Sequence, residues 1–201
     1  MKRLLTSLII MMSVLMTAAI AGQSADKVVN DATKAMLTRL KAESAQIKQN
    51  PMHVETIVKD VVLPVVDADS VSRRVLAKHY KNANAVQQKQ FAAEFEAFLI
   101  RFYARAFANY DGEDIVFDGA PEIDARGNAV VKTNIVRKNN QVIPVAYRLS
   151  PVADSWKVYD VVVEGISLVQ SKKEEFNPLI ESKGLDQVIT DLRKINDEAA
   201  K

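Results

Sequence analysis

The spacing of hydrophobic residues changes twice along the chain. Between residues 24 and 110, apolar residues recur every three or four positions, which is the period of helices with one buried side. Between residues 114 and 164, short apolar runs are separated by turn residues, as in β-strands. The helical spacing then returns and continues to the end. This order of helices, sheet and helices predicts an α+β fold.

Capping and breaking residues divide the helical parts. Asn50 can cap a helix whose first position is Pro51, so a break is expected there. Pro64 should end that second helix, because the residue before a proline avoids the helical conformation. The expected helices are 24–49, 51–63, a third capped by Asp67 or Asp69, 84–110, 166–176, and two further pieces divided at Asn177-Pro178 and Gly184.

Four strands are expected, at roughly 113–118, 129–138, 141–150 and 155–164. Asn139-Asn140 separates the middle two, and Asn tolerates the positive φ that a two-residue hairpin turn requires. Short connections favour an antiparallel meander. The last two strands carry hydrophobic residues on both faces. The sheet must therefore be covered on both sides or bind an apolar ligand on one of them.

The helix predicted at 84–110 carries most of the aromatic residues. Phe91, Phe95, Phe98 and Phe102 follow one another at spacings of four, three and four, which places them in one stripe. Such a stripe usually packs into a core. Together with a curved apolar sheet it would also suit the wall of a ligand cavity. Periodicity alone does not distinguish a filled core from a ligand-filled one.

The first residues are typical of an export signal. Lys2 and Arg3 precede an apolar run, and Ala19-Ile20-Ala21 fits the small-x-small rule for cleavage. A membrane anchor is the alternative, but the run is barely long enough to span a bilayer and contains four hydroxyl residues. We expect residues 1–21 to be a cleaved signal peptide. Residues 22–201 would then form one domain in the periplasm.

Charge and residue types argue against several classes of protein. The chain has 27 basic and 25 acidic residues, and removing Lys2 and Arg3 leaves equal numbers. This balance argues against binding nucleic acid through its phosphates. The chain has no cysteine and two histidines, so neither disulfides nor a structural zinc site are expected. No metal or cofactor is predicted.

No catalytic motif stands out. The sequence has no nucleophile elbow, phosphate-binding loop or dinucleotide fingerprint. Asp160 is the one acid inside an apolar strand, so an isomerase-like enzyme with a buried aspartate is one alternative to a binding protein. Such an acid more often accepts hydrogen bonds from backbone or an arginine. Four arginines are candidates to meet a phosphate group, although solvated arginines are more common: Arg73, Arg74, Arg101 and Arg105.

Four segments, in order and spanning nearly the whole mature chain, resemble the MlaC family, also described as toluene-tolerance auxiliary proteins. They are Ile47–Ile57 with Leu63–Asp67, Phe91–Phe98 with Tyr103–Ala106 and Tyr110–Gly112, Trp156–Asp160 with Glu164–Val169, and Lys183–Asp186. Two departures are visible. Val65 stands where many relatives have an aromatic residue, and Gln170-Ser171-Lys172 replaces the common Asn-Tyr-Arg.

The resemblance implies a fold that encloses a deep apolar pocket for the acyl chains of a phospholipid, with the headgroup near solvent and no reaction. It implies a monomeric carrier between an outer-membrane lipoprotein–porin complex and the inner-membrane substrate-binding ring of an ABC transporter, which maintains outer-membrane lipid asymmetry. A carrier of another apolar cargo and a structural adaptor with a filled core are the alternatives. Strand parity and the helical stripe predict the lipid-binding residues Phe98, Phe102, Val145, Tyr147, Leu149, Val158 and Val162. A register error of one residue would exchange the strand members for their neighbours.

Overall fold

The computed structural model describes residues 23–108 and 110–199 and confirms the α+β class. The expected signal peptide and Asn109 lie outside the described residues. The helices are α1 (Ala25–Ala42), α2 (Ser44–Gln49), α3 (His53–Val61), α4 (Ala68–Leu76), α5 (Ala85–Ala108), α6 (Leu168–Lys183) and α7 (Leu185–Ala199), with short 3-10 helices η1 (Leu63–Val65) and η2 (Ala77–Lys81).

The sheet is an antiparallel meander with the strand order β1-β3-β4-β5-β6, and β2 also pairs with β3. Its four longer strands correspond to the four that the sequence predicts, and two strands of two residues each are added. Asn140 has φ 61°, as expected, but the turn is longer than the predicted two residues, because the Arg137 N–H donates to the Gln141 carbonyl and leaves residues 138–140 between them. The strands are β1 (Asp114–Phe117), β2 (Glu122–Ile123), β3 (Ala129–Val136), β4 (Val142–Val152), β5 (Ser155–Val163) and β6 (Ile166–Ser167).

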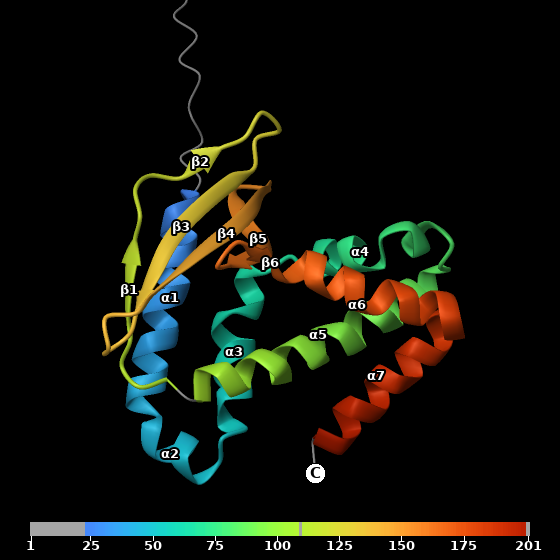
Figure 1. Ribbon diagram of the computed structural model, residues 1–201, viewed down its shortest axis with the longest axis horizontal. Helices are drawn as coiled ribbons and strands as arrows, with labels where there is room; N and C mark the ends of the chain where they lie inside the picture. Colours follow the sequence, from blue (N-terminus) through green and yellow to red (C-terminus); the bar gives the residue numbers. More distant parts are fainter. Residues whose placement is uncertain (1–22, 109, 200–201) are drawn as a thin grey trace, which may run out of the picture.

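The elements form two regions joined by α5 (Figure 1). In the first region, α1 packs against β3 and β5. In the second, α4 and α7 pack against α5, and α6 packs against α4 and α7. The long helix α5 begins in the second region. Its other end contacts α3 and lies below the sheet in Figure 1.

The buried hydrophobic residues fall into three clusters, each held by different elements. Cluster 1 lies between α4, α5, α6 and α7, and cluster 2 between α1, α2, α3 and α5. Cluster 3 joins the first turns of α1 to β3, β4 and β5. Cluster 3 comprises Ala25, Val28, Val29, Ala129, Val131, Leu149 and Val158.

Two predicted helix boundaries are wrong. The first helix does not run unbroken to Gln49, because Glu43 adopts φ −102° and ψ 13° and separates α1 from α2. The side chain of Glu43 pairs with Arg39 and with His53 of α3, which fixes this bend.

The predicted break at Asn177-Pro178 is also wrong, because α6 continues through Pro178. A proline inside a helix costs about 3 kcal/mol. Phe176 and Ile180, on either side of it, are both buried in cluster 1, so tertiary packing outweighs that cost. The side-chain amide of Asn177 donates to the carbonyls of Lys173 and Val75, which holds α6 against α4.

Candidate apolar binding site

One face of the sheet, which we call the inner face, is mainly hydrophobic, with Thr133 as a buried polar residue on it. Tyr147 of β4 pairs with Val131, and Val145 pairs with Thr133. Side chains of directly paired residues share a face, and alternate residues along a strand return to it. Tyr147 and Val145 therefore lie on the same face, and Leu149 follows in the same alternation. Three of the predicted lipid-binding residues are thus brought together.

A β-bulge in β5 changes which residues join the inner face. Arg148 pairs with Asp160 but the next residue, Leu149, pairs with Val158, so Tyr159 is an extra residue in β5. Val158 therefore lies opposite Leu149 on the inner face, as predicted.

Beyond the bulge the alternation of β5 is reversed. Val161 pairs with Tyr147 and Val163 pairs with Val145, which places both valines on the inner face. Val162 pairs with Ala146 and lies on the outer face. The prediction that Val158 and Val162 share a side is wrong, because a bulge shifts the two-residue period by one position.

The phenylalanine stripe of α5 begins in the core and ends at the surface. Successive rings stack with centroids 5.3, 6.2 and 6.0 Å apart from Phe91 to Phe102. Phe91 and Phe95 are buried in cluster 1, and Phe98 is half-buried against it. Phe102 is 52% exposed. The two predicted residues on this helix thus lie where the stripe leaves the core.

Two tyrosines add neutral hydroxyl groups to these apolar surfaces. Tyr103 packs edge-on against Phe102, with ring centroids 5.1 Å apart. Burial raises the pKa of Tyr103 to about 12, and the carboxylates of Glu175 and Asp160 act in the same direction. Burial also raises the pKa of Tyr147. Both phenols therefore stay protonated at neutral pH.

The carboxylate of Asp160 accepts hydrogen bonds from neighbouring groups and is not positioned to act as a catalytic base. Its side chain is 4% exposed. One oxygen accepts hydrogen bonds from Arg148 at 3.0 Å and from the Ser167 hydroxyl at 2.7 Å, and the other accepts from the Val169 backbone N–H at 3.1 Å. A general base needs a lone pair directed at its substrate. The hydrogen-bonded role expected for this residue is confirmed.

The candidate phosphate-binding arginines are engaged with other side chains. Arg73 lies over the ring of Tyr80, and Arg74 lies over that of Tyr159. Arg101 pairs with the buried Glu55, with Nε and Oε1 3.6 Å apart. The side chain of Arg105 lies outside what the structure describes.

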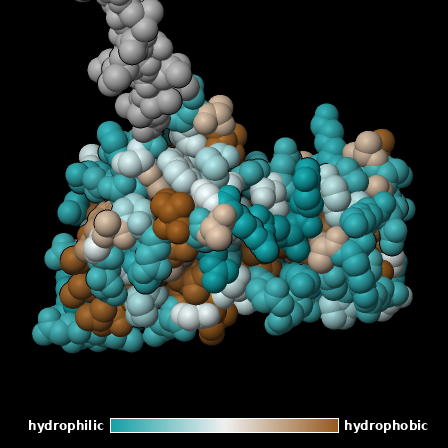
Figure 2. All heavy atoms as spheres, turned by 90° about the horizontal axis from the view of Figure 1, so that it is seen from above, coloured by the Kyte–Doolittle hydropathy of each residue, from teal (hydrophilic) through white to brown (hydrophobic). Residues whose placement is uncertain are grey.

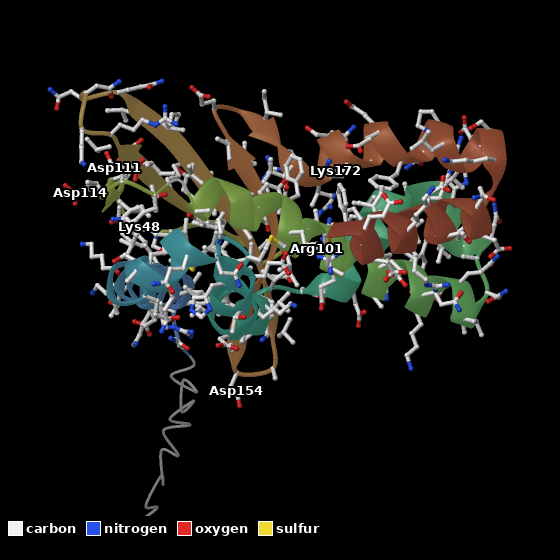
Figure 3. The ribbon with its side chains drawn as sticks, turned by 90° about the horizontal axis from the view of Figure 1, so that it is seen from below. Lys48, Arg101, Asp111, Asp114, Asp154 and Lys172 are labelled. Carbon is white, nitrogen blue, oxygen red and sulfur yellow. The ribbon has the colours of Figure 1, made fainter. Side chains whose placement is uncertain are left out.

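The sequence did not single out Lys172 as a site residue, although its segment is one where the family resemblance departs. Its ammonium lies 5.0 Å from the ring centroid of Phe98 and 4.7 Å from that of Phe102. In Figure 3, Lys172 projects from α6 toward the middle of the molecule. Only its contacts across the fold reveal this position, because Phe98 and Phe102 are some 70 residues away in the chain.

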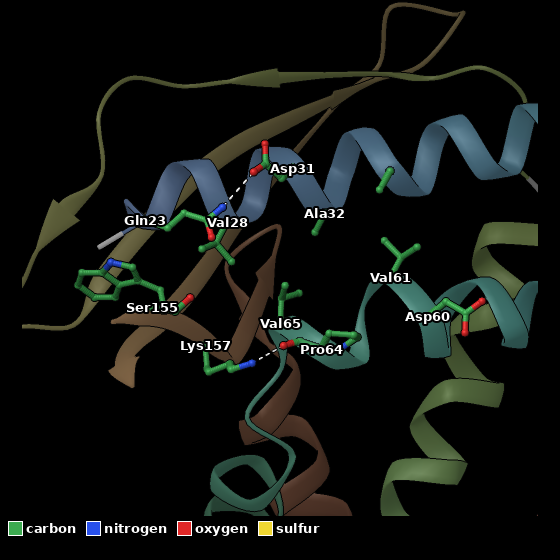
Figure 4. Close-up of a pocket in the computed structure, with 12 residues that line it drawn as sticks. Gln23, Val28, Asp31, Ala32, Asp60, Val61, Pro64, Val65, Ser155 and Lys157 are labelled. Carbon is green, nitrogen blue, oxygen red and sulfur yellow. Dashed lines mark hydrogen bonds between the residues drawn. The ribbon is translucent and has the colours of Figure 1, made fainter. Parts of the chain in front are cut away.

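A groove of about 280 Å³ opens between α1, η1 and the start of β5 (Figure 4). Val28 and Ala32 line it from α1, and Val65 and Trp156 from the other side. Sites for drug-sized ligands usually measure about 300–1,000 Å³. The groove is therefore slightly smaller than such sites, and the sequence pattern did not predict it.

The two regions also differ at the surface. Figure 2 shows hydrophobic residues reaching the surface over the half that contains the sheet, whereas the helical half is mostly hydrophilic. Within residues 23–108 and 110–199, no helix combines the length and hydrophobicity needed to cross a membrane. In the same part of the chain, no three acidic or histidine side chains gather as metal ligands would.

Comparisons with known proteins agree with this architecture. The chain is 28% identical over 176 residues to the intermembrane phospholipid transport system binding protein MlaC of Haemophilus influenzae, covering 86% of this chain and 78% of that one. It is 29% identical over 180 residues to the toluene tolerance protein ttg2D of Pseudomonas putida, covering 89% and 83%.

A solved structure has the same fold. It is a phospholipid-binding protein from Ralstonia solanacearum in complex with a phospholipid, with a TM-score of 0.79, 24% identity, and coverage of 89% of this chain and 99% of that one. A family model described as MlaC protein matches residues 30–194. Because that match spans most of the sequence, the chain belongs to the MlaC family. This family comprises binding and transport proteins, not enzymes.

Proposed function

We propose that this protein is a soluble periplasmic carrier of phospholipid. It moves lipid between an outer-membrane lipoprotein–porin complex and the inner-membrane substrate-binding ring of an ABC transporter, and so maintains outer-membrane lipid asymmetry. Residues 1–21 are its cleaved signal peptide, and residues 22–201 form the lipid-binding domain. The Haemophilus relative is a binding protein of a phospholipid transport system and the Ralstonia structure holds a phospholipid, and both support phospholipid as the cargo.

The observation that carries this proposal is the apolar inner face of the sheet, in a fold whose Ralstonia relative holds a phospholipid. We assign the acyl chains to this face. Its lining comprises Val145, Tyr147, Leu149 and Val158, with Val161 and Val163 in place of Val162. We also assign Phe98 and Phe102 of α5 to the site. Phe98 packs beside cluster 1, so these rings would meet the lipid away from the residues of cluster 3.

The size of the hydrophobic effect explains why a carrier needs such a face. A diacyl phospholipid has on the order of 30 methylene groups, and exposing each to water costs about 0.8 kcal/mol. Crossing an aqueous space with bare chains would therefore cost roughly 24 kcal/mol. The carrier must cover nearly all of this surface.

Binding requires the protein to make room. Two acyl chains need more space than the groove of about 280 Å³ beside α1 provides. Clusters 2 and 3 share no residue. Partly buried side chains pack around them, such as Val61 at cluster 2 and Val65 and Val161 at cluster 3. Separating the two clusters would enlarge the groove, and α1 must also move away from the sheet for the chains to reach Leu149 and Val158, because both are buried in cluster 3. We infer that lipid enters by this separation.

Native mass spectrometry of the mature protein purified from the periplasm, followed by lipid extraction, tests the proposal. We expect adducts whose masses match mixed phospholipids. An unliganded mass that stays unchanged after incubation with phospholipid vesicles would overturn the carrier function and favour an adaptor with a filled core. An adduct of several kilodaltons would indicate a protein cargo instead.

Neighbouring valines in β5 provide a matched pair for the same measurement. Val161 and Val162 are both partly buried but lie on opposite faces of the sheet. Val161→Gln should lower lipid occupancy several-fold, because it places an amide among the acyl chains. Val162→Gln should leave occupancy near the wild-type level. Equal occupancy in the two variants would contradict the assignment of the chains to the inner face.

A further inference from the structure

Lys172 occupies an unusual position for a lysine. It belongs to the second turn of α6, and its side chain is only 12% exposed. The ammonium lies over the rings of Phe98 and Phe102, at 5.0 and 4.7 Å from their centroids. Phe102 itself is 52% exposed, so this covered cation stands beside the solvent-facing end of the aromatic stripe.

Covering this charge is costly, and the two cation–π contacts and one ion pair offset part of the cost. A lysine ammonium is a compact and strongly hydrated charge, so its removal from water is unfavourable. Its ion-pair partner Glu175, at 2.6 Å, is 49% exposed, and pairs with such exposed partners contribute little. Leucine or methionine would cover the two rings without any loss of hydration. The charge therefore points to a role beyond packing.

The backbone fixes the position of Lys172. Ser167 caps α6 by accepting from the N–H of Gln170. Asp160 of β5 accepts from both the Ser167 hydroxyl and the Val169 N–H. Lys172 comes one helical turn after Val169, so the sheet anchors the start of the helix that carries it. A binding group on such a rigid element is held ready for its ligand.

The ammonium also retains hydrogen-bonding capacity. It has three donors, and among the described residues Glu175 is the acceptor found within hydrogen-bond distance. Of the arginines considered as phosphate ligands, Arg74 lies over Tyr159, and Arg101 forms an ion pair with Glu55 while its Nη1 has no hydrogen-bond partner among the described residues. What distinguishes Lys172 is that its ammonium lies directly over Phe98 and Phe102, at the end of the phenylalanine stripe.

We propose that Lys172 binds the phosphate of the phospholipid headgroup, at the solvent-facing end of the phenylalanine stripe. This inference rests on the proposed carrier function. In the structure the Glu175 carboxylate pairs with Lys172, where the lipid phosphate would bind. The Glu175 side chain is half-exposed, so it can turn into solvent when the phosphate binds. The rings of Phe98 and Phe102 then lie between the charged headgroup and the chains. Lys172 selects phosphate-bearing lipids over neutral lipids with the same chains.

The test compares two lipids that differ in the phosphate. Delipidated mature protein is titrated with vesicles that contain either phosphatidylglycerol or diacylglycerol with the same chains, and bound lipid is quantified by extraction and mass spectrometry. Lys172→Met should weaken phosphatidylglycerol binding about tenfold, the effect of one lost charge-assisted hydrogen bond, and leave diacylglycerol binding unchanged. Lys172→Arg should restore phosphatidylglycerol binding. Lys89→Met, a charge loss at an exposed position on α5, should bind both lipids as the wild type does.

The outcomes separate the two proposals. If Lys172→Met weakens both lipids equally, or weakens neither, Lys172 does not bind phosphate while the carrier function stands. If the wild type takes up neither lipid, the carrier function fails and this inference fails with it. Glycerol 3-phosphate distinguishes a headgroup from a soluble phosphate ester. We expect no binding of it by calorimetry, and binding that Lys172→Met abolishes would overturn the lipid-headgroup assignment.

Discussion

The two halves of α5 carry the same sequence pattern but have different surroundings. In the first half, Phe91 and Phe95 are 0% and 1% exposed. The ring of Phe176 meets both edge-on, at 6.1 and 5.5 Å. In the second half the stripe continues with the same ring stacking, yet Phe102 is 52% exposed. A periodic aromatic stripe therefore shows which side of the helix is apolar. Whether that side forms a core or a binding surface depends on the elements that pack against it.

The difference follows from what lies opposite each half. Helices α4, α6 and α7 close around the first half, and cluster 1 is the result. The second half packs on α3 through Ile100 and Ala104, while Phe102 faces away from this cluster. We interpret the first half as the part that maintains the fold and the second as the part that meets lipid.

The largest expected effect is in the first half. Phe95→Ala removes a fully buried ring that contacts three other rings, and should lower the free energy of unfolding by about 3–5 kcal/mol. Urea denaturation followed by circular dichroism measures this loss. A decrease below about 1 kcal/mol would mean that cluster 1 refills the space and is not the rigid part of the molecule.

The second half should behave in the opposite way. Phe102→Ala removes a half-exposed ring, so the loss of stability should stay under about 1 kcal/mol, whereas phospholipid occupancy should fall several-fold. The same denaturation and mass-spectrometric measurements apply. Val86→Ala, at a 64% exposed position near the start of α5, should change neither quantity. An equal loss of stability in Phe102→Ala and Phe95→Ala would contradict the different roles assigned to the two halves of α5.

The smallest effect concerns pH and the link between α5 and α7. Burial acts to raise the pKa of Glu94, but hydrogen bonds from Asn196 and Arg193 outweigh it and hold the pKa below its ordinary value of 4.5. A lowered pKa in the folded state stabilises the protein above about pH 4.5, and this contribution is lost as pH falls through the folded value. Thermal melts between pH 3 and 6 should therefore show a shallower pH dependence for Glu94→Gln. An unchanged slope would show that this link contributes nothing to acid sensitivity.

Local patterns predicted most of the fold. Helical spacing located α5, and Asn139-Asn140 marked the turn between β3 and β4, because both depend on residues close in sequence. Helix α6 runs past Pro178 against its local signal. The reason is the packing of Phe176 and Ile180 against other helices, which a single sequence does not display.

The candidate site was harder to predict for the same reason. Strand parity placed Val145, Tyr147 and Leu149 on one face, because β4 alternates without interruption against β3. It failed for Val162, because the extra residue Tyr159 leaves no mark in the hydrophobic pattern. The sequence pattern does not indicate Lys172, because the rings that surround it belong to another helix.

The position of α1 has a consequence for the order of folding. Its first turns belong to cluster 3, yet the strand residues that cover them come roughly 100 residues later in the chain. The strands β3, β4 and β5 pair with their immediate neighbours in sequence, so they close short loops that cost little entropy. Helix α1 must therefore wait for the meander to form before it can bury Val28 and Val29. During folding the amino-terminal end would be the last part of the domain to become protected, with its hydrophobic side available to a chaperone.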